Sequence, residues 1–424
     1  MKAGGYVMEE KKLILGKDRY YSLNTHETRV NNNVLVVGTS GAGKTRSIVI
    51  PNLLQATGSY IVSDPKGNLY QQYREYLEKR GYVVKKLDFT NPLDSVHYNF
   101  FRYIRNTQDI VKVAHMLICY HKEGTRNMDP FWNESGKLLM QAAISYLIES
   151  KYGENQNLHA LMNLISYGGV IEDKVTGRTK LEHLMLNVGN RHPDSYAYNT
   201  YLKVRCAAER TMRSILVTVF ARMGRFDTPA MNQMMSYDDI DIASIGQRKT
   251  ALFVVVSDTD RSMDDLANIF FTQAMNELCR YADKWGEDSR LPVPVRFILD
   301  DFATNCTIAD FPRMISSIRS REISTMLMIQ AESQLTEKFG YDGRTIIGNC
   351  DTYVYLGGND IETAKAVAER CDVPLKKILN MPIGNNWIFR RGQEPVYGEN
   401  FDLEEMLERR REREEELDRE EASY

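Results

Sequence analysis

The chain has 424 residues, of which 43% are hydrophobic and 26% are charged. This is close to ordinary soluble usage, and no run of residues resembles a membrane span or a secretory signal. The length exceeds that at which one hydrophobic core keeps growing, so we expect two domains or one domain with a large insertion. Six cysteines occur without a Cys-x-x-Cys pair or clustered histidines, which indicates neither a disulfide framework nor a zinc site and fits a reducing compartment.

The formal net charge of -3 is an average over unlike regions. Eleven acidic residues and five arginines follow Phe401, so the rest of the chain is close to neutral. A nearly neutral body carries no general attraction for nucleic acid. Any contact with nucleic acid must therefore come from local patches.

Seven short apolar runs recur between helical stretches and predict buried strands. They cover Val34 to Gly38, Tyr60 to Ser63, Val83 to Leu87, Ala251 to Val256, Val295 to Asp300, Thr325 to Gln330 and Thr352 to Leu356. Their continuous apolar character, without alternation, is typical of a parallel sheet covered on both faces by helices. The fold class is therefore α/β.

This alternation of short apolar runs and helical stretches stops between about Tyr103 and Arg205, where apolar residues recur at three- and four-residue spacing. We expect an all-helical domain over residues 105–205, inserted into a sheet domain made of residues 1–104 and 206–401. Residues 402–424 form a charged tail rich in helix formers, with many opposite charges four residues apart. Its composition favours a solvated helix or frayed end over a partner-binding tail.

The segment "NVLVVGTSGAGKT" joins a predicted strand to a predicted helix. Its glycines allow a tight turn whose amides surround phosphate oxygens at the positive end of a helix. Lysine in this pattern reaches the β- and γ-phosphates, and the following hydroxyl ligates Mg²⁺. We expect ATP to bind the loop residues Gly38, Thr39, Ser40, Gly41, Ala42, Gly43, Lys44 and Thr45, with Mg²⁺ on Thr45.

A P-loop also needs an acidic element to orient Mg²⁺ and to activate water. The apolar strand in "VRFILDDF" ends in two carboxylates. We expect Asp300 to hold Mg²⁺ and Asp301 to polarise the attacking water. Taken alone, the two acids would serve equally well as caps of a following helix; the P-loop favours the catalytic role.

Two further elements would complete this chemistry. Gln330 ends another apolar strand, where an amide can orient water, and Arg319 or Arg321 in "SSIRSRE" can act from a neighbouring subunit. For either arginine alone, a surface salt bridge is the default. In "SDPKGNLY", Asp64 and Lys66 either face the nucleotide or form a simple turn and helix start.

In this order, the motifs resemble the cytoplasmic part of type IV coupling proteins, the TraG-like ATPases of bacterial conjugation and type IV secretion. The resemblance covers nearly the whole chain. Besides "GTSGAGKT", "DPKGNLY" and "LDDF", it rests on "PNLL" at Pro51 to Leu54, "DPFW" at Asp129 to Trp132 and "IQAESQL" at Ile329 to Leu335.

The resemblance implies a RecA-like nucleotide-binding domain interrupted by an all-helical domain and assembled as a ring, a homo-hexamer, whose channel passes DNA. It implies Lys44 and Thr45 on phosphate and Mg²⁺, Asp300 and Asp301 as the acidic pair, Arg319 as a finger in trans and Gln330 as a sensor. The implied partners are single-stranded DNA, the relaxase and the secretion channel, at the cytoplasmic face of the bacterial inner membrane.

The sequence departs from the family at two points. Asp301 stands where the family usually has Glu, and the membrane-spanning helices that usually precede the nucleotide-binding domain are not in this chain. Either the anchor is missing here, or the chain docks on a separate membrane partner. Two other functions stay open: a RecA-like DNA translocase or helicase not tied to secretion, and a nucleotide-gated receptor with negligible hydrolysis.

Overall fold

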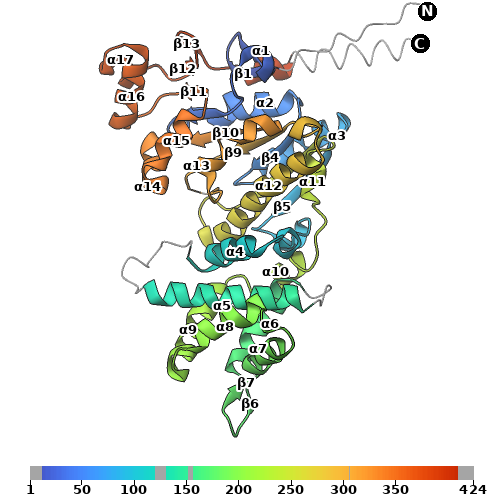
Figure 1. Ribbon diagram of the computed structural model, residues 1–424. Helices are drawn as coiled ribbons and strands as arrows, with labels where there is room; N and C mark the ends of the chain where they lie inside the picture. Colours follow the sequence, from blue (N-terminus) through green and yellow to red (C-terminus); the bar gives the residue numbers. More distant parts are fainter. Residues whose placement is uncertain (1–11, 120–129, 151–155, 305, 409–424) are drawn as a thin grey trace, which may run out of the picture. The chain divides into compact units, whose positions relative to one another are not determined.

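A computed structural model describes residues 12–119, 130–150, 156–304 and 306–408 of the chain (Figure 1). In this part of the chain, nine strands form one sheet in the order β13-β12-β11-β3-β10-β9-β4-β8-β5. They are β3 (Val34–Val37), β4 (Ser59–Ser63), β5 (Val83–Asp88), β8 (Thr250–Val255), β9 (Val295–Leu299), β10 (Ile323–Ile329), β11 (Thr352–Tyr355), β12 (Asn385–Arg390) and β13 (Val396–Glu399).

The centre of this sheet is parallel. From β11 through β3, β10 and β9 to β4, every neighbouring pair runs in the same direction, whereas β12 and β13 are added antiparallel at one edge. Strands β3, β4 and β9 are buried along their whole length. The predicted mostly parallel α/β sheet is confirmed.

All seven predicted strands are present, with ends that agree within two residues. The strands that the apolar pattern did not reveal include β12, β13 and a separate antiparallel hairpin of β1 (Lys12–Gly16) and β2 (Arg19–Ser22). Of these, β2 and β13 have no buried residue, and a strand without a buried face needs no apolar run.

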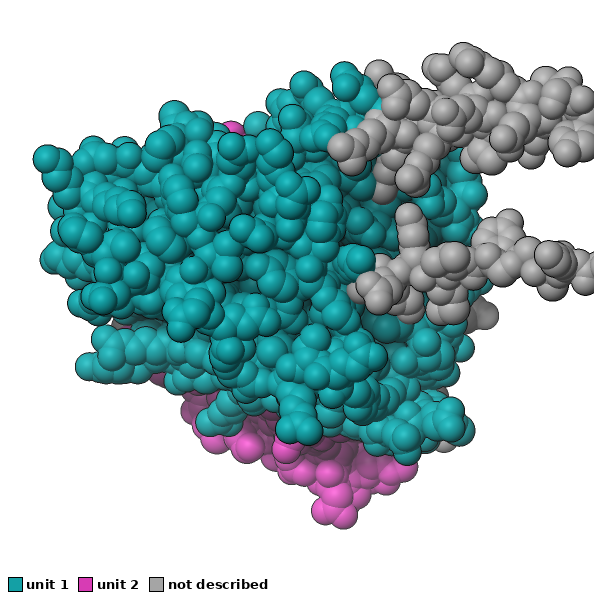
Figure 2. All heavy atoms as spheres, turned by 90° about the horizontal axis from the view of Figure 1, so that it is seen from above, with its two compact units in different colours: residues 1–84, 243–253, 278–424 teal, residues 85–242, 254–277 magenta. Residues whose placement is uncertain are grey.

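Helices link these strands, and the chain divides into two compact units, which Figure 2 colours separately. One unit comprises residues 1–84, 243–253 and 278–424, and the other comprises residues 85–242 and 254–277. The helices linking the strands of the sheet are α1 (Thr25–Thr28), α2 (Ile50–Leu54), α3 (Asn68–Lys79), α11 (Ile242–Ile245), α12 (Asp264–Trp285), α13 (Phe311–Met314), α14 (Glu332–Phe339), α15 (Asp342–Gly348), α16 (Ile361–Cys371) and α17 (Leu375–Leu379).

The second unit contains the helical segment. Its helices are α4 (Thr107–Cys119), α5 (Pro130–Glu149), α6 (Leu158–Ser166), α7 (Lys180–Arg191), α8 (Tyr196–Arg205), α9 (Glu209–Met223) and α10 (Pro229–Met234). The prediction that residues 105–205 are all helical is wrong in one place, because β6 (Ile171–Asp173) and β7 (Arg178–Thr179) form a hairpin. Asp173 closes its turn by accepting hydrogen bonds from the backbone of Val175 and Thr176.

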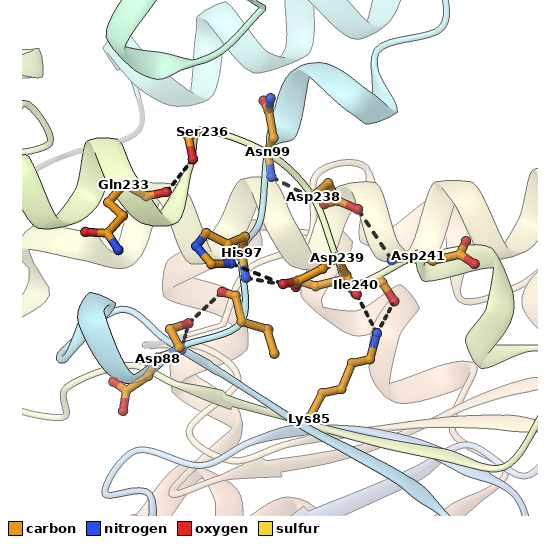
Figure 3. A network of polar contacts seen from close by, with 12 residues as sticks. Lys85, Asp88, His97, Asn99, Gln233, Ser236, Asp238, Asp239, Ile240 and Asp241 are labelled. Atoms are coloured by element: carbon orange, nitrogen blue, oxygen red, sulfur yellow. Dashed lines mark hydrogen bonds and ion pairs between the residues drawn. The ribbon is translucent and has the colours of Figure 1, made fainter. Parts of the chain in front are cut away.

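A polar network ties together the two chain segments that lead into and out of the helices (Figure 3). His97 donates its backbone N–H to Asp239 at 2.9 Å, and its ring nitrogen lies 3.1 Å from the same carboxylate. Lys85 donates to the carbonyls of Asp239 and Ile240. Tyr103 donates to Asp238 at 2.6 Å. The entry and exit of the helical segment therefore lie side by side, as an insertion requires.

The motif "PNLL" has a structural explanation within the first unit. Asn52 is buried, accepts from the backbone of Ile14, and donates to the carbonyls of Ile14 and Ile48. These bonds attach β1 to the helix that follows the P-loop. Each bond satisfies a backbone group that would be costly to bury alone.

Two sequence features lie partly outside the described residues. Asp129 of "DPFW" is one, and residues 409–424 of the charged tail are another. The first turn of the tail is described, and it differs from a fully solvated helix: Leu403 is buried in the core, and Met406 and Leu407 pack against it. In the described ranges, no helix is both long and apolar enough to cross a membrane.

Candidate nucleotide-binding site

The predicted phosphate loop lies between the buried strand β3 and the helix that begins at Lys44. Gly41 and Gly43 have φ of 78° and 89°, in the left-handed region that favours glycine. At Gly38, a Cβ atom would lie 3.0 Å from the Cβ of Leu356, so a side chain there would require its neighbours to shift. The backbone thus forms the type of concavity that binds anions at a helix start.

Lys44 is buried inside this loop. Its Nζ donates to the carbonyls of Gly38 at 2.6 Å and Thr39 at 3.2 Å. Burial lowers the pKa of Lys44, and the nearby carboxylates of Asp300 and Asp301 oppose this effect. The loop therefore holds a poorly solvated cation whose charge a phosphate would balance.

Thr45 and Asp300 meet at the same end of the sheet. The hydroxyl of Thr45 donates to Oδ2 of Asp300 at 3.1 Å. Burial raises the pKa of Asp300, as does repulsion from Asp301, while the Thr45 hydrogen bond and Lys44 act in the opposite direction. Hydroxyl and carboxylate oxygens are the hard ligands that Mg²⁺ prefers, so the residues present fit this ion.

Within the described residues, no group of three or more His, Cys, Asp or Glu side chains could hold a metal by itself. At nucleotide sites Mg²⁺ takes one or two protein ligands and completes its shell with phosphate and water. Thr45 and Asp300 remain the predicted protein ligands.

Asp301 has an unusual backbone. Its φ is 49°, its N–H donates to Oδ1 of Asp300 at 3.1 Å, and its carbonyl accepts from Thr304. Left-handed backbone is uncommon for residues other than glycine, although Asp tolerates it better than most, and it often marks functional sites. These backbone bonds fix the conformation from which the Asp301 side chain extends.

Gln330 and Asp64 also lie at the carboxyl edge of the sheet. Ile329 pairs with Val37 and its carbonyl accepts from the N–H of Gly38, which places Gln330 beside the start of the loop. Asp64 is buried and accepts from the backbone of Tyr70 at 2.9 Å. It therefore caps the start of α3, one of the two interpretations left open, and burial raises its pKa, with Asp300 adding repulsion.

The two arginines lie elsewhere. Arg319 precedes β10 and donates to the carbonyl of Thr25 at 3.1 Å. Because β10 has seven residues, about 20 Å of strand separates Arg319 from the edge of the sheet where the phosphate loop of the same chain lies. Arg321 makes two hydrogen bonds to Asp283, at 2.8 and 2.9 Å, so the salt-bridge interpretation is correct for Arg321.

The loop after β11 also contacts the phosphate loop, which the sequence analysis did not recognise. Thr39 donates its N–H to the carbonyl of Gly357 at 3.1 Å, and a Cβ on Gly358 would lie 3.7 Å from the nitrogen of Thr39. The available signal was the pair of glycines directly after the predicted strand Thr352 to Leu356. Such a pair at the end of a strand indicates a close approach of two backbones.

The glycine loop after a buried parallel strand, the enclosed lysine and the hydroxyl–carboxylate pair define a P-loop nucleotide-binding protein of the RecA-like class. The family model for type IV secretory system conjugative DNA transfer matches residues 2–372. The chain therefore belongs to that family, and the resemblance to type IV coupling proteins is confirmed.

Individual relatives are distant. The type IV secretion system-coupling proteins VirD4 of Bartonella henselae and Bartonella quintana are each 20% identical over 347 residues, covering 78% of this chain and 51% of theirs. The chain thus spans about half the length of these curated relatives.

Among solved structures, plasmid coupling protein TrwB in complex with ADP and Mg²⁺ is similar in fold. The TM-score is 0.64 at 16% identity, covering 94% of this chain and 92% of that one. VirB4 of Thermoanaerobacter pseudethanolicus has a TM-score of 0.56 at 12% identity, covering 95% and 98%. At these identities the likeness shows the shared fold alone.

The charges at the site predict a cost in stability. A raised pKa means that folding favours protonated Asp300, so its ionised form destabilises the fold above that pKa. Asp300→Asn, which can still accept from Thr45, should stabilise the nucleotide-free protein at pH 7.5 by about 0.5–2 kcal/mol, measured by denaturant unfolding.

This gain should shrink as the pH falls toward the ordinary carboxyl pKa, because the wild-type side chain then takes up a proton. The exposed Asp194→Asn is the control and should give no such gain. A destabilised Asp300→Asn protein at pH 7.5 would contradict the electrostatic account.

Proposed function

We propose that this chain is the ATP-hydrolysing motor of a type IV coupling protein and that it drives DNA transfer. The hydrogen bond between Thr45 and Asp300, beside Lys44 in the glycine loop, carries the proposal, because it joins the phosphate and metal elements in one place. The proposal is also supported by the family match and by the similar TrwB structures, one in complex with ADP and Mg²⁺ and another with a non-hydrolysable ATP analogue.

Each residue then has a definite task. Lys44 would exchange its bonds to the loop carbonyls for bonds to the β- and γ-phosphates. Thr45 and Asp300 would hold Mg²⁺, which when bound neutralises charge on the phosphates. Asp301 would accept the proton of the attacking water, and Gln330 would orient that water.

Asp301 is one methylene shorter than the usual Glu, which makes its position critical. The left-handed backbone sets the direction in which its side chain leaves the strand end. We infer that this local geometry offsets the missing methylene. A nucleotide-gated receptor with negligible hydrolysis is the second candidate, since it needs Lys44 and Thr45 but not a well-placed Asp301.

The wider assignments follow from family membership. We infer that the motor works as a homo-hexameric ring, meets single-stranded DNA, the relaxase and components of the secretion channel, and acts at the cytoplasmic face of the bacterial inner membrane. A translocase or helicase not tied to secretion would share the ring and the DNA. Such a translocase or helicase would not use its helical segment to recruit a relaxase. Binding of a relaxase to this segment therefore distinguishes the two functions.

The Lys44→Ala protein should lose ATP hydrolysis while keeping its fold, because the side chain serves the phosphates and not the core. The measurement is phosphate release with and without single-stranded DNA, together with circular dichroism. Stimulation of the wild type by DNA is expected. The control is Lys365→Ala, at an exposed i, i+3 ion pair with Glu362, which should leave the rate unchanged. Wild-type hydrolysis by folded Lys44→Ala would refute the site.

Two substitutions at one position separate the motor from the receptor. Asp301→Asn should keep Mg-ATP binding and slow turnover, because an amide cannot accept the proton of water. Asp301→Glu should not raise the rate if the left-handed backbone already places the shorter acid correctly. Single-turnover hydrolysis measures the rates of both variants. Equally negligible rates for wild type and Asp301→Asn would favour the receptor.

Arg319 should act on the nucleotide of another subunit, because its own loop lies at the opposite edge of the sheet. An arginine finger contributes on the order of 10³-fold or more to turnover. Arg319→Ala should therefore be nearly inactive, and mixing it with Lys44→Ala should restore part of the activity, since some sites combine an intact loop with an intact arginine.

Co-purification of differently tagged chains must first establish that mixed rings form. Arg321→Ala is the matched control: it removes a neighbouring arginine that is paired with Asp283, and it should retain most activity. Mixed rings without activity above either mutant alone would exclude a trans role for Arg319.

A further inference from the structure

A cavity lies at the opposite edge of the sheet from the phosphate loop. Its volume is about 500 Å³, within the range of small-molecule sites. It is lined by the first residues of β4, β9 and β10 and by the segment that leads from β2 into α1. These elements all belong to the first compact unit, so the cavity is formed within one body.

Arg296 of β9 is the unusual residue in this cavity. Its side chain lines the cavity although the residue is only 8% exposed. Its Nε donates to the hydroxyl of Ser324 at 3.2 Å, and among the described residues it forms no ion pair with a carboxylate. The terminal nitrogens of the guanidinium thus have no protein acceptor in the described part of the chain.

Such a placement is costly without an anion. Burial lowers the pKa of Arg296, yet a guanidinium keeps its proton in proteins, so the charge stays. A largely buried charge without an acidic partner is unfavourable, and an oxyanion that binds the guanidinium fork would offset that cost. The other basic residue of the cavity, Arg319, is exposed at its rim and engages the carbonyl of Thr25.

We propose that this cavity binds a small molecule that carries a phosphate or carboxylate, with Arg296 as its anion-binding residue. Glu27 and Glu322 also line the cavity, so the ligand should present hydrogen-bond donors away from its anionic end. Ser22 and Thr25 line the same cavity, so polar groups are also available for the middle of such a molecule. The site is separate from the phosphate loop and needs no hydrolysis.

The test uses the wild-type chain with its phosphate loop filled by Mg-ADP, at a concentration where sedimentation shows monomers. Phenylglyoxal modifies accessible guanidinium groups, and mass spectrometry follows each arginine. Inorganic phosphate or acetate, at constant ionic strength against chloride, should slow the modification of Arg296 saturably. The rate should fall about tenfold at ten times the midpoint concentration, because only the empty cavity reacts.

Arg321 provides an internal control, since it is paired with Asp283 outside the cavity lining. Its modification should not depend on phosphate. In calorimetry with the loop filled, Arg296→Met should abolish phosphate binding and Arg321→Met should retain it. Labelling of the wild type remains decisive if Arg296→Met does not fold.

Three results would overturn the proposal. They are no modification of Arg296, modification that neither anion slows, and protection that appears only at concentrations where rings form. The last result would mean that the anion belongs to a neighbouring chain. None of these results depends on ATP hydrolysis, so failure of this site is distinguishable from failure of the proposed motor.

Discussion

The parallel order of β3, β10 and β9 is the constraint on which the site depends. Parallel strands end at the same edge, so the residues after them are brought together whatever their separation in sequence. Thr45 and Asp300 are 255 positions apart, yet a hydrogen bond of 3.1 Å joins them. Gln330 arrives beside Gly38 for the same reason, because β10 lies between the other two strands.

The same constraint explains why so much was predictable from sequence. Most strands of this sheet are buried and mostly apolar, so seven of them could be located, and the residues that follow them become site candidates. What could not be predicted depends on tertiary context. Strands β12 and β13 gain stability by pairing antiparallel with each other beside β11, and the role of Asn52 depends on β1 packing beside a helix far from it in the chain.

Side-chain roles were less predictable than positions. The sequence of "DPKG" is compatible with both a nucleotide contact and a helix cap, and only the bond from Tyr70 to Asp64 establishes the cap. Likewise, Arg319 and Arg321 are equivalent in sequence, but Asp283 engages only Arg321. The two arginines lie two residues apart in a short helical turn, and they have different neighbours. Their spacing in the sequence does not reveal this difference.

The nucleotide site and the Arg296 cavity share a physical feature at opposite edges of the sheet. In the first, burial works against the charges of Lys44 and Asp300; in the second, it works against the charge of Arg296. A protein retains such charges at a cost to its own stability, and that cost falls when a ligand of opposite charge binds. The strand β10, buried almost throughout, runs from one edge to the other. A sheet built in this way holds two charged sites rigidly apart, and binding at either should stabilise the fold that presents the other.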